Sequence, residues 1–268
     1  MTAILEAPQP RRRRRGRRIA LDVLGPLATF GLLLVAWHAA TRIFDWPVWL
    51  VPAPLDVAEA LWDFRDLLPH QFRVTLLETL AGFGLAVAIG VPLAVAIAYS
   101  RLLERTIYPL LLALNAVPKI AIAPILILWM GFGYGPKIVV SLLLCIFPIV
   151  IGTATGLKST AAELVELGRS LCASELQIFR RIRFPAALPQ IFVGLKVAIS
   201  LAVIGAVIGE FVGASEGLGW VIVNSGANVN TSLAFAAMVL LAVMSIALFY
   251  ALELIERLVV PWAEHESS

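Results

Sequence analysis

The chain has 268 residues and a formal net charge of +3; 60% of its residues are hydrophobic and 15% are charged, with a mean hydropathy of +0.91. Soluble domains are about half apolar and a quarter charged, so this composition excludes an ordinary soluble protein. Backbone groups in lipid must be satisfied within the structure, which leaves helix bundles and closed barrels. The apolar runs are long and continuous rather than alternating, so we expect an all-α membrane protein.

The first predicted segment is a basic tail, residues 1–20, with seven arginines between Arg11 and Arg18. Such a run can bind nucleic acid, but next to an apolar helix we interpret it as a cytoplasmic tail and expect no nucleic-acid partner. The apolar run that follows is long enough to span a bilayer and has no small-residue cleavage site after it. We therefore do not interpret it as a secretory signal.

Runs of about twenty apolar residues predict six transmembrane helices within a membrane domain of residues 21–264, followed by a short tail of residues 265–268. The predicted spans are residues 23–40, 75–99, 107–130, 136–157, 187–211 and 233–260. The third span is the least regular. Pro118 and Pro124 each remove a backbone donor from it, so we expect it to be kinked.

The distribution of lysine and arginine predicts the orientation. With the N-terminus inside, the cytoplasmic segments hold fifteen of these residues and the outer segments, which include Lys137, hold four. The bias persists without the tail, at eight to four. Both termini are therefore expected in the cytoplasm.

Two outer segments lie between the spans. Asp45–Arg73 contains tryptophans that suit a membrane interface, and Asp56 is a candidate cap for a short amphipathic helix there. Gly213–Ser232 is rich in glycine and asparagine, which predicts a loop with short turns. Neither segment is large enough to form a receptor domain.

The cytoplasmic loop between the fourth and fifth spans, residues 158–186, is charged but keeps the apolar spacing of helices. Its apolar positions are Ala161, Leu164, Val165, Gly168, Leu171, Leu176, Phe179 and Ile182. Ser174 is typical of a helix start, and Pro185 and Pro189 end the amphipathic stretch. This pattern predicts two short amphipathic helices. Periodicity alone equally allows an interfacial helix lying under the bilayer.

The stretch "ELVELGRSLCASELQIFRRIRFPAALPQIFVGLKVAI" resembles the conserved cytoplasmic loop of permease subunits of ATP-binding-cassette importers. Glu166, Ile182 and Pro185 fall on that family's glutamate, isoleucine and proline with the spacing kept. The stretches "VPAPLDVAEALW", "LAGFGLAVAIGVPLAVAIAYSR", "AVPKIAIAPILILWMGFG" and "GEFVGASEGLGW" are similar to the nitrate/sulfonate/taurine-type branch. The resemblance runs in order from about Val51 to Trp262.

The loop also departs from the family pattern. Leu167 and Gly168 replace two alanines, Phe184 replaces a leucine, and Cys172 replaces the glycine of the turn between the two short helices. A positive φ at that turn is easy only without a Cβ, so Cys172 argues against the family's turn geometry. Gly168 is then the candidate for the relocated flexibility. Cys172 is interpreted as a small packing residue, not a redox switch.

The resemblance implies a type I importer permease of the MetI-like kind: six transmembrane helices with a cytoplasmic coupling-helix loop, in a bacterial cytoplasmic membrane. It implies a homodimer of this chain, cytoplasmic ATP-binding-cassette ATPase subunits, and a periplasmic or extracellular substrate-binding protein. The chain has no phosphate-binding Gly-x-x-x-x-Gly-Lys-Ser/Thr loop, so we expect neither enzyme activity nor a cofactor, and its two cysteines form no metal-binding or disulfide pattern. The residues expected to couple to the ATPase are Glu163, Glu166, Gly168, Arg169, Cys172, Ala173, Arg180, Arg181, Ile182 and Pro185.

Ionisable residues inside spans are candidates for the translocation path, because their burial in lipid is costly. Lys119, next to Pro118 in the kinked span, and Lys196 could offer a passing anion a favourable field; each could instead pair with a glutamate or, near a span end, extend to the headgroups. For Glu210 we favour a structural role. The expected solute is small and anionic, such as a sulfonate, taurine, nitrate or bicarbonate.

Two other functions fit the composition. An ion-coupled secondary transporter without an ATPase would suit six spans with membrane carboxylates, but the cytoplasmic loop would then lack a purpose and no inverted repeat is evident. A channel or a membrane scaffold leaves the loop equally unexplained.

Overall fold

The computed structural model describes residues 12–262, with side chains described from residue 28 onward and at residue 25. In this range the chain is helical and contains no strand. Its elements are α1 (Arg12–Ile43), α2 (Pro54–Asp63), α3 (Leu68–Tyr99), α4 (Arg101–Ala116), α5 (Lys119–Met130), α6 (Tyr134–Lys158), α7 (Ala162–Ser170), α8 (Glu175–Ile178), the π-helical turn η1 (Phe179–Arg183), α9 (Phe184–Gly213), α10 (Leu218–Ala227) and α11 (Thr231–Val259).

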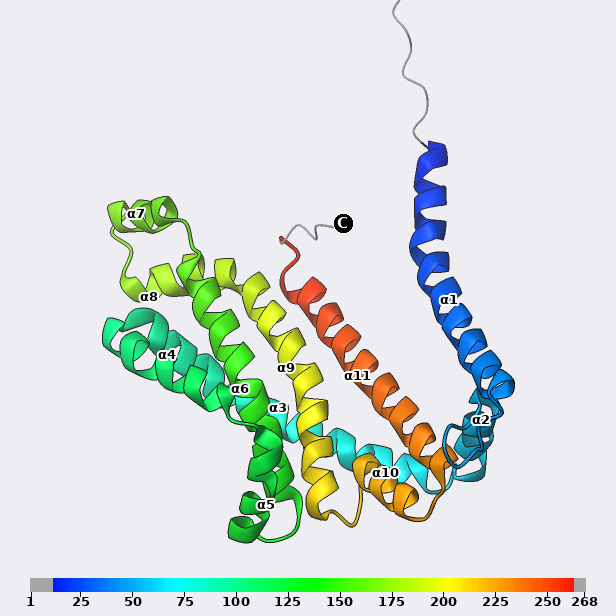
Figure 1. Ribbon diagram of the computed structural model, residues 1–268. Coiled ribbons are helices and arrows are strands. Elements are labelled where there is room, and N and C mark those ends of the chain that lie inside the picture. Colours follow the sequence, from blue (N-terminus) through cyan, green and yellow to red (C-terminus); the bar gives the residue numbers. More distant parts are fainter. Residues whose placement is uncertain (1–11, 263–268) are drawn as a thin grey trace, which may run out of the picture.

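The centre of the bundle is formed by α3, α6 and α9, which Figure 1 shows crossing one another. Small residues bring these helices into backbone contact. A Cβ on Gly152 of α6 would lie 2.9 Å from the Cα of Gly194 on α9, and a Cβ on Gly205 would lie 2.5 Å from the Cα of Ser141. Such contacts drive helix association in lipid, where apolar burial between helices offers no advantage over the lipid tails.

Four helical segments in the described range are long and apolar enough to cross a membrane: α3, α6, the continuous helix of residues 175–213, and α11. They coincide with the second, fourth, fifth and sixth expected spans. The first expected span lies within α1, whose described apolar part is Ala28–Ile43. Residues 1–11 of the expected basic tail and the whole expected tail 265–268 lie outside the described residues.

The third expected span is two helices rather than one kinked helix. α4 and α5 meet at an angle of 93°. The break falls at Val117 and Pro118, whose ψ angles of 128° and 106° are extended. The proline ring disfavours the helical conformation at the preceding residue, which favours a break at this position. Pro124, also expected to kink the span, lies within α5.

The two segments expected on the outer side each contain a short helix. In α2 the Asp56 side chain accepts a hydrogen bond from the backbone N–H of Ala53 at 2.8 Å, so Asp56 caps the helix from its third position. Gly213–Ser232, expected as a loop, contains the ten-residue α10. Leu218 and Val221 of α10 are buried in an apolar cluster with α3 and α11, and this packing overrides the weak helix propensity of the segment's glycines and asparagines.

Candidate functional site

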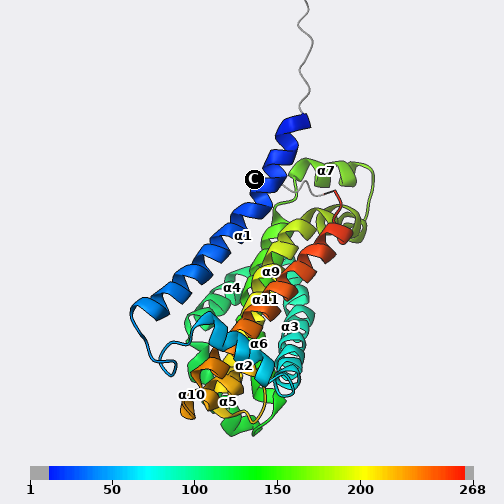
Figure 2. The same ribbon diagram turned by 90° about the vertical axis from the view of Figure 1, so that its right-hand side faces the viewer.

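The loop helices α7 and α8 lie at one end of the bundle, and α5 and α10 lie towards the other (Figures 1 and 2). The expected helix start at Ser174 is confirmed. The Ser174 Oγ accepts a hydrogen bond from the Gln177 backbone N–H at 3.3 Å, and the Gln177 Oε1 accepts one from the Ser174 N–H at 2.8 Å. This reciprocal capping box fixes the point where α8 begins.

The turn after α7 corrects the expectation for Cys172. Its φ is +57°, so the cysteine itself adopts the left-handed conformation. The Ala173 N–H donates to the Gly168 carbonyl at 3.0 Å and the Cys172 N–H donates to the Arg169 carbonyl at 2.9 Å. These two bonds form a Schellman cap. The hydrogen bonds of the cap hold the turn at the family's glycine position although a cysteine occupies it.

Gly168 does not relocate the flexibility of the loop. It lies within α7 and is buried. A Cβ there would lie 3.0 Å from Ile182 Cδ1 and 3.3 Å from Ile178 Cγ1. The missing side chain therefore lets α7 rest directly on α8 and η1, which makes Gly168 a packing residue.

The predicted coupling residues of the loop differ in their contacts and exposure. Arg169 donates from its Nε and Nη2 atoms to Glu175 Oε1 at 3.1 and 3.0 Å, an exposed ion pair that joins α7 to α8. Glu166 and Arg169 also line a pocket of about 350 Å³ with Lys158 and Arg183. Other predicted coupling residues are exposed on the loop, namely Glu163, Arg180 and Arg181, whereas Ala173, Ile182 and Pro185 are partly buried.

The outward surface of the loop is apolar between its charges. Val165 and Ile178 are buried against the loop's own helices, but four leucines are exposed. These are Leu164, Leu167, Leu171 and Leu176, with exposed fractions of 48%, 56%, 74% and 64%. An apolar stripe with a charged rim is typical of a surface that binds a protein partner.

Arg183 connects the loop to the bundle, a role that the sequence analysis missed. Its guanidinium carbon lies 5.2 Å from the centre of the Tyr99 ring at the end of α3, and Phe179 meets the same ring edge-on at 5.8 Å. These contacts join η1 to the end of α3. The loop spacing gave no signal for this contact, because Tyr99 lies 84 positions earlier in the chain.

Lys119 lies at the break between α4 and α5. Its Nζ donates to the Asn115 Oδ1 at 3.0 Å and to the Asn115 carbonyl. Both residues line a largely apolar pocket of about 170 Å³ closed by side chains of α6, including Ile146 and Phe147. Pro118 is the N-cap residue of α5 in an extended conformation, and Lys119 is the first residue of that helix.

Lys196 adopts the paired arrangement that the sequence left open. Its Nζ lies 2.8 Å from Glu256 Oε2 on α11, and 5.9 Å from the centre of the Phe249 ring. The pair ties α9 to α11, as expected for a structural lysine.

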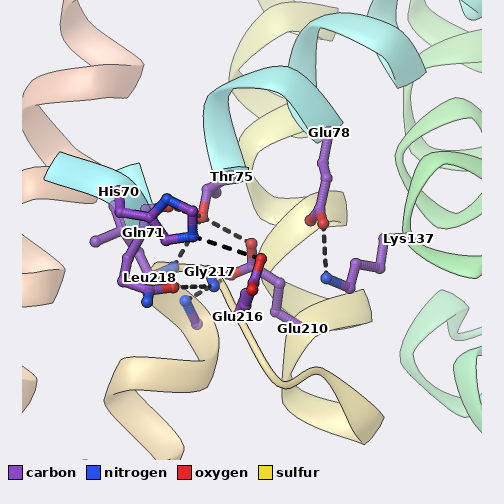
Figure 3. A network of polar contacts seen from close by, with 10 residues as sticks. His70, Gln71, Thr75, Glu78, Lys137, Glu210, Glu216, Gly217 and Leu218 are labelled. Atoms are coloured by element: carbon purple, nitrogen blue, oxygen red, sulfur yellow. Dashed lines mark hydrogen bonds and ion pairs between the residues drawn. The ribbon is translucent and has the colours of Figure 1, made fainter. Parts of the chain in front are cut away.

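Lys137 corrects the assignment to the outer loop. It is 6% exposed, in the first turn of α6, and its Nζ lies 2.6 Å from Glu78 Oε1 on α3 (Figure 3). Glu210 lies beside this pair and accepts a hydrogen bond from Thr75 Oγ1 at 2.7 Å. The sequence contained a signal for this cluster that the prediction did not use. A lysine and two glutamates near the ends of three spans have few charged or hydrogen-bonding partners in lipid except one another.

Comparisons with known proteins agree with this architecture. Residues 86–265 match the family model of the binding-protein-dependent transport system inner membrane component. The formylaminopyrimidine transport permease protein ThiX of Halalkalibacterium halodurans is 35% identical over 91% of this chain and 98% of its own. The riboflavin transport system permease protein RibX of Chloroflexus aurantiacus is 36% identical over 92% of each chain. The taurine transport system permease protein TauC of Escherichia coli is 28% identical over 92% of this chain and 90% of its own.

The fold has a counterpart among solved structures. An inward-facing structure of the MetNI methionine ABC transporter matches with a TM-score of 0.66 and 23% identity, over 74% of this chain and 98% of that one. The expected MetI-like fold is thereby confirmed.

Proposed function

Because the chain belongs to the family of binding-protein-dependent transport system inner membrane components, we propose that it is the permease subunit of an ATP-driven importer. It is a multi-pass membrane protein of the ATP-binding-cassette permease family, similar to the sulfonate and taurine branch. In the proposal two copies form the pathway in a bacterial cytoplasmic membrane, with both termini in the cytoplasm. An external binding protein delivers the solute, and separate ATPase subunits supply the energy.

The observation that carries the proposal is the loop of residues 158–186. Its exposed leucines and charged rim suit a groove on a protein partner, because apolar packing holds such a helix while charges set its register. The Schellman cap, the capping box and the Arg169–Glu175 pair hold the two helices in one arrangement. The Arg183–Tyr99 contact joins η1 to α3 and is the proposed route from the loop into the bundle. A loop held in one arrangement and joined to α3 suits a coupling element.

A matched pair of variants tests this docking role. Leu176→Asp places a charge in the exposed apolar stripe, and we expect the ATPase subunit to stop copurifying and uptake to fall at least tenfold. Leu55→Asp, at a residue that is 60% exposed on α2 near the other end of the bundle, is the control and keeps the ATPase bound. Both variants must reach the membrane at wild-type levels. Normal copurification with Leu176→Asp would refute the docking role of the loop.

The solute is proposed to pass near the break between α4 and α5. Lys119 offers a cation beside an apolar pocket, and Asn115 adds an amide. This combination suits a small organic anion with an apolar part, since the lysine attracts the charge and the pocket receives the rest. The relatives are named for formylaminopyrimidine, riboflavin and taurine, so charged and uncharged solutes both occur among them. Uptake assays with taurine, an alkanesulfonate and an uncharged pyrimidine separate the two classes.

A further inference from the structure

The start of α10 is capped by side chains from two other helices. The first backbone N–H groups of a helix lack partners within it. Here the Gly217 N–H donates to Gln71 Oε1 at 2.6 Å, the Leu218 N–H donates to Thr75 Oγ1 at 2.8 Å, and the Gly219 N–H donates to Glu210 Oε2 at 2.5 Å. Gln71 and Thr75 lie one turn apart on α3, and Glu210 lies on α9 (Figure 3). All three side chains are buried.

Two glycines make room for the Glu210 carboxylate. Gly217 has a φ of +110°, and a Cβ there would collide with Glu210 Oε1. A Cβ on Gly219 would lie 2.7 Å from Oε2. The carboxylate therefore fits against the start of α10 only because neither residue has a side chain. The close fit of the Glu210 carboxylate against the start of α10 indicates that Glu210 acts there as a hydrogen-bond acceptor.

A second buried carboxyl group, that of Glu78, has a hydrogen-bond partner in the described part of the chain for only one of its two oxygens. Glu78 is 1% exposed, and its Oε1 accepts a hydrogen bond from the Lys137 ammonium at 2.6 Å. Its Oε2 is buried and has no hydrogen-bond partner among the described residues. Figure 3 shows the Glu210 side chain on the same side of the bundle as the Glu78–Lys137 pair, next to Glu78. An ionised Glu78 would thus leave one oxygen unsatisfied and face another carboxylate.

The charges around the cluster do not balance if both glutamates are ionised. Within the cluster the side chains of Glu78 and Glu210 contribute two carboxyl groups, and Lys137 contributes one ammonium. His70 and Glu216, 3.6 Å apart, lie nearby, but their side chains are about half exposed. A buried charge without a partner costs several kcal/mol, and a carboxyl group avoids that cost by taking up a proton.

We propose that the cluster holds one proton, on Oε2 of Glu78, which donates a hydrogen bond to the Glu210 carboxylate. Each carboxylate oxygen of Glu210 has a second lone pair for it. The proton comes from solvent as the chain folds, and the cluster then contains one ammonium, one carboxylate and one neutral carboxyl. Glu78 and Lys137 thereby act as positioning residues for Glu210, which in turn anchors α10.

This anchor joins the outer ends of four helices into one unit. α6 and α9 also touch there through their backbones, because a Cβ on Gly209 would lie only 2.7 Å from the Cα of Lys137. The break between α4 and α5 lies outside the unit.

Infrared spectroscopy of the full chain in lipid nanodiscs tests where the proton lies. We expect the wild-type protein at neutral pH to show an un-ionised carboxyl C=O band that Glu78→Gln lacks. Glu78→Gln should keep wild-type thermal stability and uptake, because its amide can donate at the same place while its oxygen still accepts from Lys137. Glu78→Ala should lose both. Equal damage by Gln and Ala, or a band that persists in Glu78→Gln, would overturn the proposal.

A pH series gives a second readout that a purely structural role would not affect. Above pH ~4.3, the usual pKa of glutamate, the unfolded chain releases the Glu78 proton while the folded protein keeps it. The folding equilibrium constant of the wild type should therefore fall about tenfold per pH unit relative to that of Glu78→Gln. The fall continues for as long as the folded protein holds the proton. A pH-independent difference between the two proteins would contradict the proposal. Glu210→Gln should lower thermal stability at every pH, since its NH₂ group cannot accept from Gly219 or Thr75.

Discussion

The turn at Cys172 allows the effect of one substitution to be predicted from geometry. Its φ of +57° costs a residue with a Cβ about 1–2 kcal/mol relative to glycine. Glycine in its place removes this strain but adds about 0.5–1 kcal/mol of unfolded-state freedom. Cys172→Gly should therefore stabilise the Schellman cap by about 0.5–1 kcal/mol, which reduces the local opening of the loop about two- to fivefold.

Hydrogen exchange measures that opening at the amides of Cys172 and Ala173, which the cap protects. Cys172→Ala is the matched control, since it removes the thiol but keeps the Cβ and the strained φ. We expect slower exchange in the glycine variant and unchanged exchange in the alanine variant. Equal slowing in both variants would show that the thiol, not the backbone conformation, destabilises the loop.

Three further variants probe other parts of the account. Lys119→Met should raise the KM of uptake of an anionic solute about ten- to hundredfold, because it removes a charged contact worth about 1.5–3 kcal/mol, with ATP hydrolysis intact; an unchanged KM would exclude Lys119 from the path. Lys196→Met should destabilise the protein by about 1–3 kcal/mol in thermal unfolding, and adding Glu256→Gln should recover part of the loss; additive losses would refute the pair. Gly152→Ala should lower the free energy of unfolding by about 1–3 kcal/mol in thermal unfolding, because the added methyl group clashes with α9. Gly84→Ala, with open space around the added methyl group, should leave that free energy unchanged or raise it slightly. Equal effects of the two substitutions would contradict the close approach of α6 and α9.

Much of the fold could be predicted from the sequence because lipid imposes long apolar helices. The loop helices were also predictable, since Ser174 and the apolar spacing are local signals. The break at Pro118 was anticipated only as a kink, because local sequence does not show that α5 turns through 93° to pack elsewhere. The helix α10 was missed because its stability comes from packing and capping by distant side chains.

The parts of the candidate site that depend on residues close together in the sequence could be predicted, whereas contacts between distant residues could not. The two short helices of the loop were predicted from its apolar spacing, and its coupling role from its resemblance to the permease family. Gly168 and Cys172 nevertheless exchange the roles expected for them, since the glycine packs and the cysteine forms the turn. Lys137 was placed in solvent because positive-inside counting treats any lysine near a span end as exposed. Its partner Glu78 is 59 positions away, and only the packing of α3 against α6 brings the two together.

The central claim is that this chain carries a solute inward with energy from a separate ATPase. The direct test is uptake into proteoliposomes that contain the chain, the copurified ATPase and the external binding protein, with the ion gradients collapsed. We expect uptake that requires ATP and the binding protein, and that Leu176→Asp abolishes. Uptake that is driven by a proton or sodium gradient without ATP would contradict it and favour an ion-coupled transporter.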